Sequence, residues 1–164
     1  MNTKGYGEVK LKHPNWQVPT FKSQVFTVKK HDYVICVFVI NEGEKIQKQI
    51  KKMQPYTSLA DIVIADGGST DGSLESVYLK KHGIRALLVK TDHGKLSSQM
   101  RMALAWSLTE GYKGVIVIDG NGKDDVSAIP DFIELLKDGY DHIQGSRFIK
   151  GGKAVNTPIS RLIG

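Results

Sequence analysis

The sequence contains little of what would mark several classes of protein. Its 164 residues include a single cysteine, Cys36, which excludes an internal disulfide and a cysteine-rich metal site. The longest strictly apolar run, residues 34–40, is too short to cross a bilayer, and the polar residues 1–12 lack the apolar stretch of a secretory signal. Neither a P-loop nor a glycine-rich dinucleotide fingerprint after a strand is present. A reducing, cytoplasmic setting is therefore the default expectation.

Basic charge is present but unevenly distributed. The chain has 23 Lys and Arg against 17 Asp and Glu, a net charge of +6. Residues 1–30 hold six lysines and one glutamate, so they contribute +5 of that total. The nearly neutral remainder argues against a nucleic-acid surface, whose basic residues usually lie on the folded module. We expect residues 1–31 to form a polar basic extension, either solvated or in peripheral contact with the anionic inner face of a membrane, and residues 32–164 to form the domain.

Strand and helix patterns alternate from residue 32 onward. Continuous apolar runs predict buried strands at residues 33–40, 61–65, 84–90 and 114–118, followed by a short fifth strand at residues 141–144. Helical patterns occupy residues 43–54, 73–82, 96–110 and 126–137. The third helix carries one apolar stripe, composed of Leu96, Met100, Ala103, Leu104 and Leu108. The alternation predicts an α/β fold with a mostly parallel sheet and helices on both faces.

Polar or charged groups follow all five predicted strands. Ligands bind beyond the carboxyl ends of the strands in sheets of this type. The strand-end segments are residues 41–42, 66–68, 91–95, 119–121 and 145–147. One such end would be ordinary loop chemistry, but five that converge predict a cleft for a polar ligand.

Asp119, at the end of the fourth predicted strand, is the sharpest of these features. Asn121 follows two residues later, and oxygen ligands at that spacing suit Mg²⁺ or Mn²⁺ bridging phosphates. The alternative is a strand-end turn in which Asp119 bonds to its own backbone. A calcium loop is excluded because Lys123 and Asp124 occupy its fifth and sixth positions. A phosphohydrolase is disfavoured because Asn121 cannot protonate a leaving group.

Three other strand ends offer ligand contacts. Asp66, in the glycine-rich segment after the second strand, is placed to accept a hydrogen bond from a nucleobase, whereas Asp71 is predicted to cap the next helix. Lys95 and Arg147 offer cations to a phosphate. For both cations the alternative is a solvated surface residue.

Taken in order, the strand-end motifs resemble those of a known family. They read NE at residues 41–42, DGGSTDGS at 66–73, GK at 94–95, VIDGNG at 117–122 and GSRFIKGG at 145–152. The set resembles family 2 glycosyltransferases with the GT-A fold, and among them the polyprenyl-phosphate (dolichyl-phosphate) mannose or glucose synthase-like branch. The resemblance implies transfer of a sugar, with inversion, from a UDP- or GDP-linked donor to polyprenyl phosphate or a glycan. It also implies a C-terminally truncated chain, because catalytic domains of the family continue past the GSR motif.

The resemblance implies a role for individual positions. Asn41 and Glu42 belong to the nucleotide pocket, and Asp66 lies at the base. Asp119 and Asn121 occupy the metal-binding pair. Lys95 and Arg147 lie near the diphosphate, and Arg161 is a weaker match to a later arginine.

Two departures from the family pattern bear on chemistry. Gly67 replaces the second acid of the nucleoside motif, and Asn121 replaces the second metal carboxylate with a neutral amide. We expect Lys123 to replace part of the cation's charge, so that the metal requirement is weak. Asp124 and Asp125 are the nearest downstream carboxylates and candidate catalytic bases, although helix N-capping is the alternative. A non-catalytic nucleotide-sugar-binding module and a purely structural α/β domain remain alternative interpretations.

Overall fold

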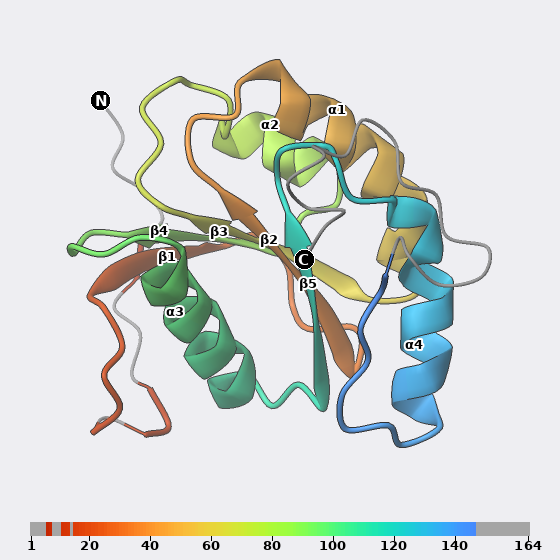
Figure 1. Ribbon diagram of the computed structural model, residues 1–164. Helices are drawn as coiled ribbons and strands as arrows, with labels where there is room; N and C mark the ends of the chain where they lie inside the picture. Colours follow the sequence, from red (N-terminus) through yellow and green to blue (C-terminus); the bar gives the residue numbers. More distant parts are fainter. Residues whose placement is uncertain (1–5, 8–10, 14, 147–164) are drawn as a thin grey trace, which may run out of the picture.

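A computed structural model describes residues 6–7, 11–13 and 15–146 and shows an α/β fold (Figure 1). One five-stranded sheet has the order β1-β4-β3-β2-β5, and all of its pairings are parallel except that of β1 with β4. The elements are β1 (Phe21–Val25), β2 (Tyr33–Val39), α1 (Glu44–Met53), η1 (Gln54–Ser58), β3 (Asp61–Asp66), α2 (Ser76–Lys81), β4 (Ala86–Lys90), α3 (Leu96–Thr109), β5 (Gly114–Asp119), η2 (Val126–Ala128) and α4 (Ile129–Lys137). The predicted fold class is confirmed, and the arrangement is consistent with a GT-A-like fold.

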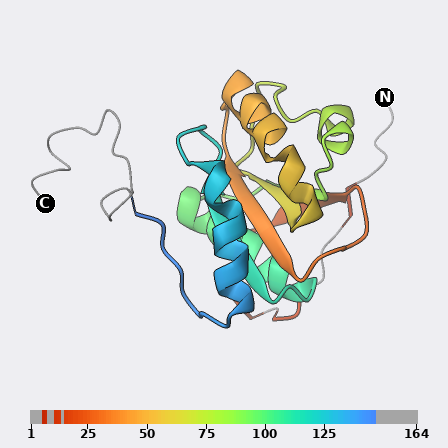
Figure 2. The same cartoon turned by 90° about the vertical axis from the view of Figure 1, so that its right-hand side faces the viewer.

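Helices cover both faces of the sheet. The apolar side chains of α1, α2 and α4 pack in one core with alternate residues of β2, such as Ile35 and Val37. The intervening residues Val34, Cys36 and Phe38 pack with α3 on the other side. The ribbon in Figure 2 shows helices on both sides of the sheet. Because β2 is central and buried on both faces, its sequence reads as an unbroken apolar run rather than an alternation.

The prediction of the fifth strand is wrong. Residues 141–144 form no strand; the fifth strand is instead β1, which lies in the segment expected to be an extension. β4 is the one strand that β1 pairs with among the described residues, although Ser23 also forms an isolated antiparallel bridge with Gly7, and only Ser23 and Gln24 of its five residues are buried. A short edge strand needs no continuous apolar run, and the sequence pattern therefore gave no signal for it.

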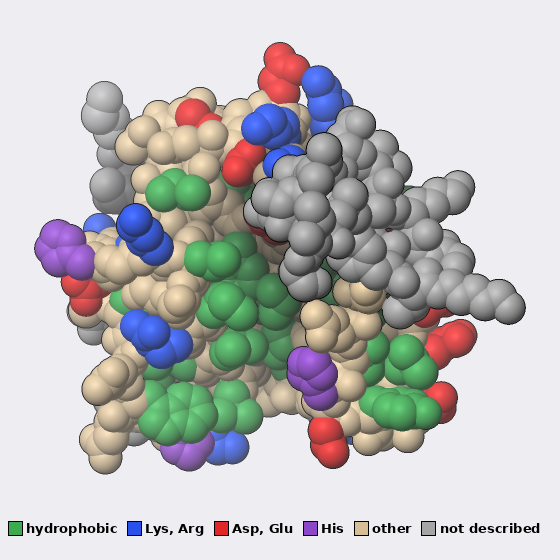
Figure 3. Space-filling view, viewed as in Figure 1, with side chains coloured by type: hydrophobic (Ala, Val, Ile, Leu, Met, Phe, Trp, Pro, Cys, Tyr) green, Lys and Arg blue, Asp and Glu red, His purple; other side chains and the backbone are tan. Residues whose placement is uncertain are grey.

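The face of α3 that packs against the sheet differs from the apolar stripe that was expected to do so. Gln99, Met102 and Trp106 are buried, whereas Leu96 and Leu104 are 54% and 41% exposed. Figure 3 shows hydrophobic side chains gathered on this outer surface near α3 and β5. In the part of the chain that the structure describes, no helix has the length and apolar character needed to cross a membrane.

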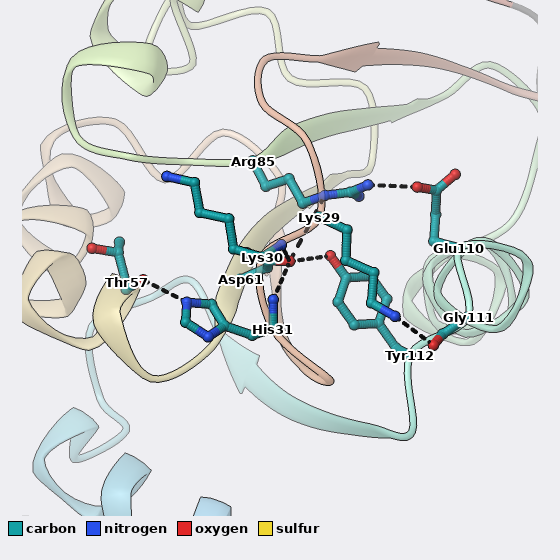
Figure 4. A network of polar contacts seen from close by, with 9 residues as sticks. All are labelled: Lys29, Lys30, His31, Thr57, Asp61, Arg85, Glu110, Gly111 and Tyr112. Atoms are coloured by element: carbon teal, nitrogen blue, oxygen red, sulfur yellow. Dashed lines mark hydrogen bonds and ion pairs between the residues drawn. The ribbon is translucent and has the colours of Figure 1, made fainter.

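A buried polar network joins the amino-terminal ends of the strands (Figure 4). The Asp61 carboxylate accepts hydrogen bonds from the Tyr112 hydroxyl at 2.7 Å and from the backbone N–H of Lys30 at 3.0 Å, and it lies 3.8 Å from Arg85 Nε. Arg85 also pairs with Glu110 at 2.5 Å. Burial, with the bond to Asp61, raises the pKa of Tyr112. This network lies at the end of the sheet opposite the strand tips, so it supports the scaffold rather than a site there.

Candidate functional site

The carboxyl ends of three neighbouring strands bring Asp66 and Asp119 to one edge of the sheet. Asp119 of β5 pairs in register with Phe38 of β2, and Asp66 of β3 pairs with Val39. The two acids therefore flank the end of β2, about 10 Å apart across two strand spacings. Side chains alternate between the two faces along a strand. By that alternation Asp119 is on the same face as Val115, which packs in the core on the α3 side. Asp66 is on the same face as Ile62 and Ile64, which pack in the core on the α1 side. A ligand that touches both carboxylates must therefore lie across the edge of the sheet.

The loop after β3 is held to the end of β2 by side chains. Asp66, which is 3% exposed, accepts hydrogen bonds from the Ser69 backbone N–H at 2.9 Å and the Ser69 hydroxyl at 2.6 Å. The same hydroxyl oxygen accepts from the Asn41 N–H at 2.9 Å, and Asn41 Oδ1 accepts from the Thr70 N–H at 2.8 Å. Asn41 and Asp66 thus shape one loop together, and the carboxylate expected to meet a base also organises that loop.

Asp71 has a different role from the predicted one. α2 begins at Ser76, with Glu75 at its cap position, so the prediction that Asp71 caps this helix is wrong. Its carboxylate instead accepts from the Ser73 hydroxyl at 2.7 Å and from the backbone N–H of Gly43 at 2.8 Å. These hydrogen bonds, chiefly those from Ser73, lower the pKa of Asp71. Asp71 therefore ties the loop after β3 to the start of α1.

The turn after β5 is built around Asp119. The Asn121 Nδ2 amide donates to Asp119 Oδ2 at 2.7 Å, and Asn121 Oδ1 accepts from the Lys123 N–H at 3.0 Å. The Asp124 carboxylate accepts from the Asp119 backbone N–H at 2.9 Å, and Gly120 donates to the Phe38 carbonyl at 2.8 Å. Asn121 thus presents an N–H, not an oxygen, to the carboxylate beside it.

This arrangement does not fit the predicted divalent cation well. A hard cation takes several oxygen ligands, but Asn121 directs a hydrogen-bond donor at Asp119. Among the described residues, no group of three or more His, Cys, Asp and Glu side chains is arranged to hold a metal. The turn therefore offers a hydrogen-bonded pair, not a ready set of oxygen ligands, to an incoming cation.

Basic side chains lie around the strand tips. Lys95 precedes α3 and Lys123 lies in the turn after β5, and both are exposed. Glu42 is engaged by Lys45 at 3.3 Å. Between α1 and the turn lies a hollow of about 180 Å³, lined by Lys45, Lys48, Gln49, Lys52, Asn121, Gly122, Asp124 and Val126. Arg147 and Arg161 lie outside the described residues.

The two candidate bases both have local structural partners. Asp125 caps the turn η2, where its carboxylate accepts from the Ser127 hydroxyl at 2.7 Å and from the Ser127 N–H at 3.0 Å. Those hydrogen bonds lower the pKa of Asp125, which makes it a weaker base. Asp124 lines the hollow and holds the β5 tip through the Asp119 N–H.

Two buried glutamines at the strand tips were not predicted. Gln99 of α3 donates through Nε2 to the carbonyls of Val39 at 2.9 Å and Ala65 at 3.1 Å, which joins the ends of β2 and β3. Gln49 of α1 contacts the turn after β5 in a similar way. Their sequence signal is a glutamine among the apolar, inward-facing positions of a helix, such as Gln49 between Ile46 and Ile50.

No family model matches the chain, but it is similar to individual curated proteins. It is 28% identical over 130 residues to glycosyltransferase AglJ of Haloferax volcanii, covering 78% of this chain and 41% of that protein. It is 26% identical over 124 residues to undecaprenyl-phosphate mannosyltransferase of Micrococcus luteus (74% and 50%) and 22% identical over 133 residues to polyprenol monophosphomannose synthase of Mycolicibacterium smegmatis (79% and 50%). The chain spans about half the length of these relatives.

Proposed function

We propose that this chain, which is similar over most of its length to named glycosyltransferases, binds a nucleotide-diphospho-sugar and transfers the sugar to an acceptor. The observation that carries the proposal is the register of β2 with its neighbours, which puts Asp66 and Asp119 on either side of one strand end. A donor of this class is elongated and polar, as a ligand lying across that edge must be. The nucleoside end and the diphospho-sugar end of such a donor differ chemically, and so do the loop after β3 and the turn after β5.

In this proposal the donor spans from the loop after β3 to the turn after β5. The nucleoside lies by Asn41, Glu42 and Asp66. The diphosphate lies by the turn of Asp119 and Asn121, where Lys123 supplies positive charge. Lys95 follows β4, three strands from β5 in the sheet, so it would meet another part of the donor. Arg147, the third predicted cation, lies outside the described residues. Cations placed there stabilise the negative charge that develops on the departing diphosphate.

The proposed transfer proceeds with inversion. The acceptor oxygen forms a bond to the anomeric carbon while the bond from that carbon to the diphosphate oxygen breaks. A hydroxyl acceptor passes its proton to a base, for which Asp124 is the better candidate because it lines the hollow beside the turn, whereas the Asp125 carboxylate is bonded to Ser127 at the start of η2. An ionised phosphate acceptor needs no such proton transfer.

Polyprenyl phosphate is the acceptor that we propose. Two relatives are named undecaprenyl-phosphate mannosyltransferase and polyprenol monophosphomannose synthase. Such an acceptor resides in a membrane, so the protein would act at the inner surface of that membrane. A glycan acceptor is the alternative that the assay below distinguishes.

A non-catalytic nucleotide-sugar-binding module is the second candidate. It is favoured by the Asn121 amide, which points its N–H at Asp119, and by Asp125, whose carboxylate caps η2. A module of this kind binds the donor without consuming it.

Turnover separates the two candidates. We expect the protein to release UDP or GDP from a matched donor only when polyprenyl phosphate is present, and to yield a lipid-linked sugar. Donor binding without release of UDP or GDP, whichever acceptor is added, would favour the non-catalytic module. Release of UDP or GDP with a glycan but not with polyprenyl phosphate would show that the acceptor is a glycan. The variant Asp124→Asn tests the base, because it should slow transfer to a hydroxyl acceptor without weakening donor binding.

A further inference from the structure

Gln49 is a buried polar residue on the inner face of α1, and only 2% of it is exposed. Its Nε2 donates to the backbone carbonyl of Asp119 at 2.9 Å, and its Oε1 accepts from the backbone N–H of Gly122 at 2.8 Å. One carboxamide thereby holds both ends of the four-residue turn that carries Asp119 and Asn121.

A glutamine matches this turn because it has a donor and an acceptor on one planar group. The turn presents a carbonyl and an N–H to the helix, and a buried backbone group left without a partner costs about 1–3 kcal/mol. An apolar side chain of the same length would fill the space but satisfy neither group. The contact therefore fixes where the turn lies relative to α1.

We propose that Gln49 is a positioning residue, which orients Asp119 and Asn121 toward the donor diphosphate without touching the donor. This inference rests on the proposed function. It is independent of any metal, because both of its contacts are to backbone atoms.

The test uses Gln49→Glu, whose two protonation states differ in the contact they allow. A protonated carboxyl donates one hydrogen bond and accepts another, as glutamine does here, whereas a carboxylate cannot donate to the Asp119 carbonyl. The charged groups around position 49 include Lys45, Lys48 and Lys52 of α1, and Asp119 and Asp124 of the facing turn. The lysines favour the ionised form, and burial and the two acids favour the protonated form.

Donor affinity should be measured between about pH 5 and pH 8, a range over which ordinary Asp and Glu side chains are mostly ionised. We expect Gln49→Glu to bind the donor nearly as well as wild type at the acidic end and about tenfold more weakly at the alkaline end. Gln49→Met should bind more weakly at every pH. The control Gln54→Glu adds the same charge at the exposed end of α1 and should follow wild type throughout.

The outcomes separate this inference from the function beneath it. If wild type binds the donor and Gln49→Glu and Gln49→Met match it at every pH, the positioning role is overturned and the proposed function stands. If wild type binds no nucleotide-sugar, the proposed function fails and the inference fails with it. If Gln49→Met does not fold, the pH dependence of donor affinity in Gln49→Glu decides alone. A ratio of the donor affinities of Gln49→Glu and Gln54→Glu that does not change with pH would contradict the inference.

Discussion

Asp119 and Asn121 form a hydrogen-bonded pair at the end of β5, and this pairing changes what the turn offers to a ligand. The amide N–H of Asn121 partly satisfies the carboxylate, so the turn presents less free negative charge than two acids would. Lys123 follows in the same turn and is exposed. Positive charge for a diphosphate is therefore available from the protein itself.

From this we predict a weak metal requirement. Removing divalent cations with a chelator should change donor binding by less than about threefold, whereas Lys123→Gln should weaken it about tenfold, as expected for loss of one charge-assisted contact. Lys137→Gln, at the exposed end of α4, is the control. Binding that disappears with the chelator and returns with Mn²⁺ would show that a cation holds the diphosphate.

Single residues differed in how far their sequence positions revealed their roles. Asp66 and Asp119 were predictable as strand-end acids because a buried strand is easily recognised and ends abruptly. The cap assigned to Asp71 was wrong because α2 starts three residues later than the helical pattern suggested. Gln49 and Gln99 were missed because periodicity shows which face is apolar but not which backbone groups need a partner there.

At the scale of elements, tertiary contacts decided what local patterns did not. α3 buries Gln99 and Trp106 instead of its leucine stripe, since Gln99 must reach the ends of β2 and β3. β1 formed from a segment of low apolar content because β4 offered an unpaired edge. Strands and helices of the interior were predictable, but the edge and the exact helix face were not.

The network around Asp61 predicts that the starts of β3 and β4 depend on one another. Asp61→Asn leaves the buried guanidinium of Arg85 without its carboxylate on that side, and loss of one partner of a buried pair typically costs about 3 kcal/mol. We expect the urea midpoint to fall accordingly. Asp32→Asn removes an exposed pair with Lys113 and should change the midpoint little. Equal midpoints for the two variants would contradict the structural role of the network.

Gly120 lies where the tips of β5 and β2 pack closely against each other. A Cβ at this position would lie 2.8 Å from both the Phe38 carbonyl oxygen and Val39 Cγ2, too close for either strand to stay in place. Gly120→Ala should therefore cost about 1–3 kcal/mol of stability and also weaken donor binding. Gly139→Asn is the matched control, because it lies beyond the end of α4, nothing lies within 4 Å of its Cβ position and asparagine tolerates a positive φ such as its +89°. Unchanged stability and donor binding in Gly120→Ala would mean that this close packing does not matter.

For the whole molecule, the candidate site lies at the carboxyl ends of the parallel strands, and the buried ionic network lies at their amino ends. The parallel order of β4, β3, β2 and β5 follows from the alternation of strands and helices, so the sequence sufficed to predict a shared edge. It did not suffice to predict that the two acids leave opposite faces of the sheet. That depends on the register of β2 against each neighbour.

The most direct test is calorimetry of the whole protein with UDP, GDP and their sugar conjugates, on wild type and Asp119→Ala. The account predicts that wild type binds at least one nucleotide-diphospho-sugar, and that Asp119→Ala reduces that affinity at least tenfold while the fold is retained. No binding by any conjugate, or the same affinity in Asp119→Ala as in wild type, would contradict the claim that the strand tips around β2 form a donor site.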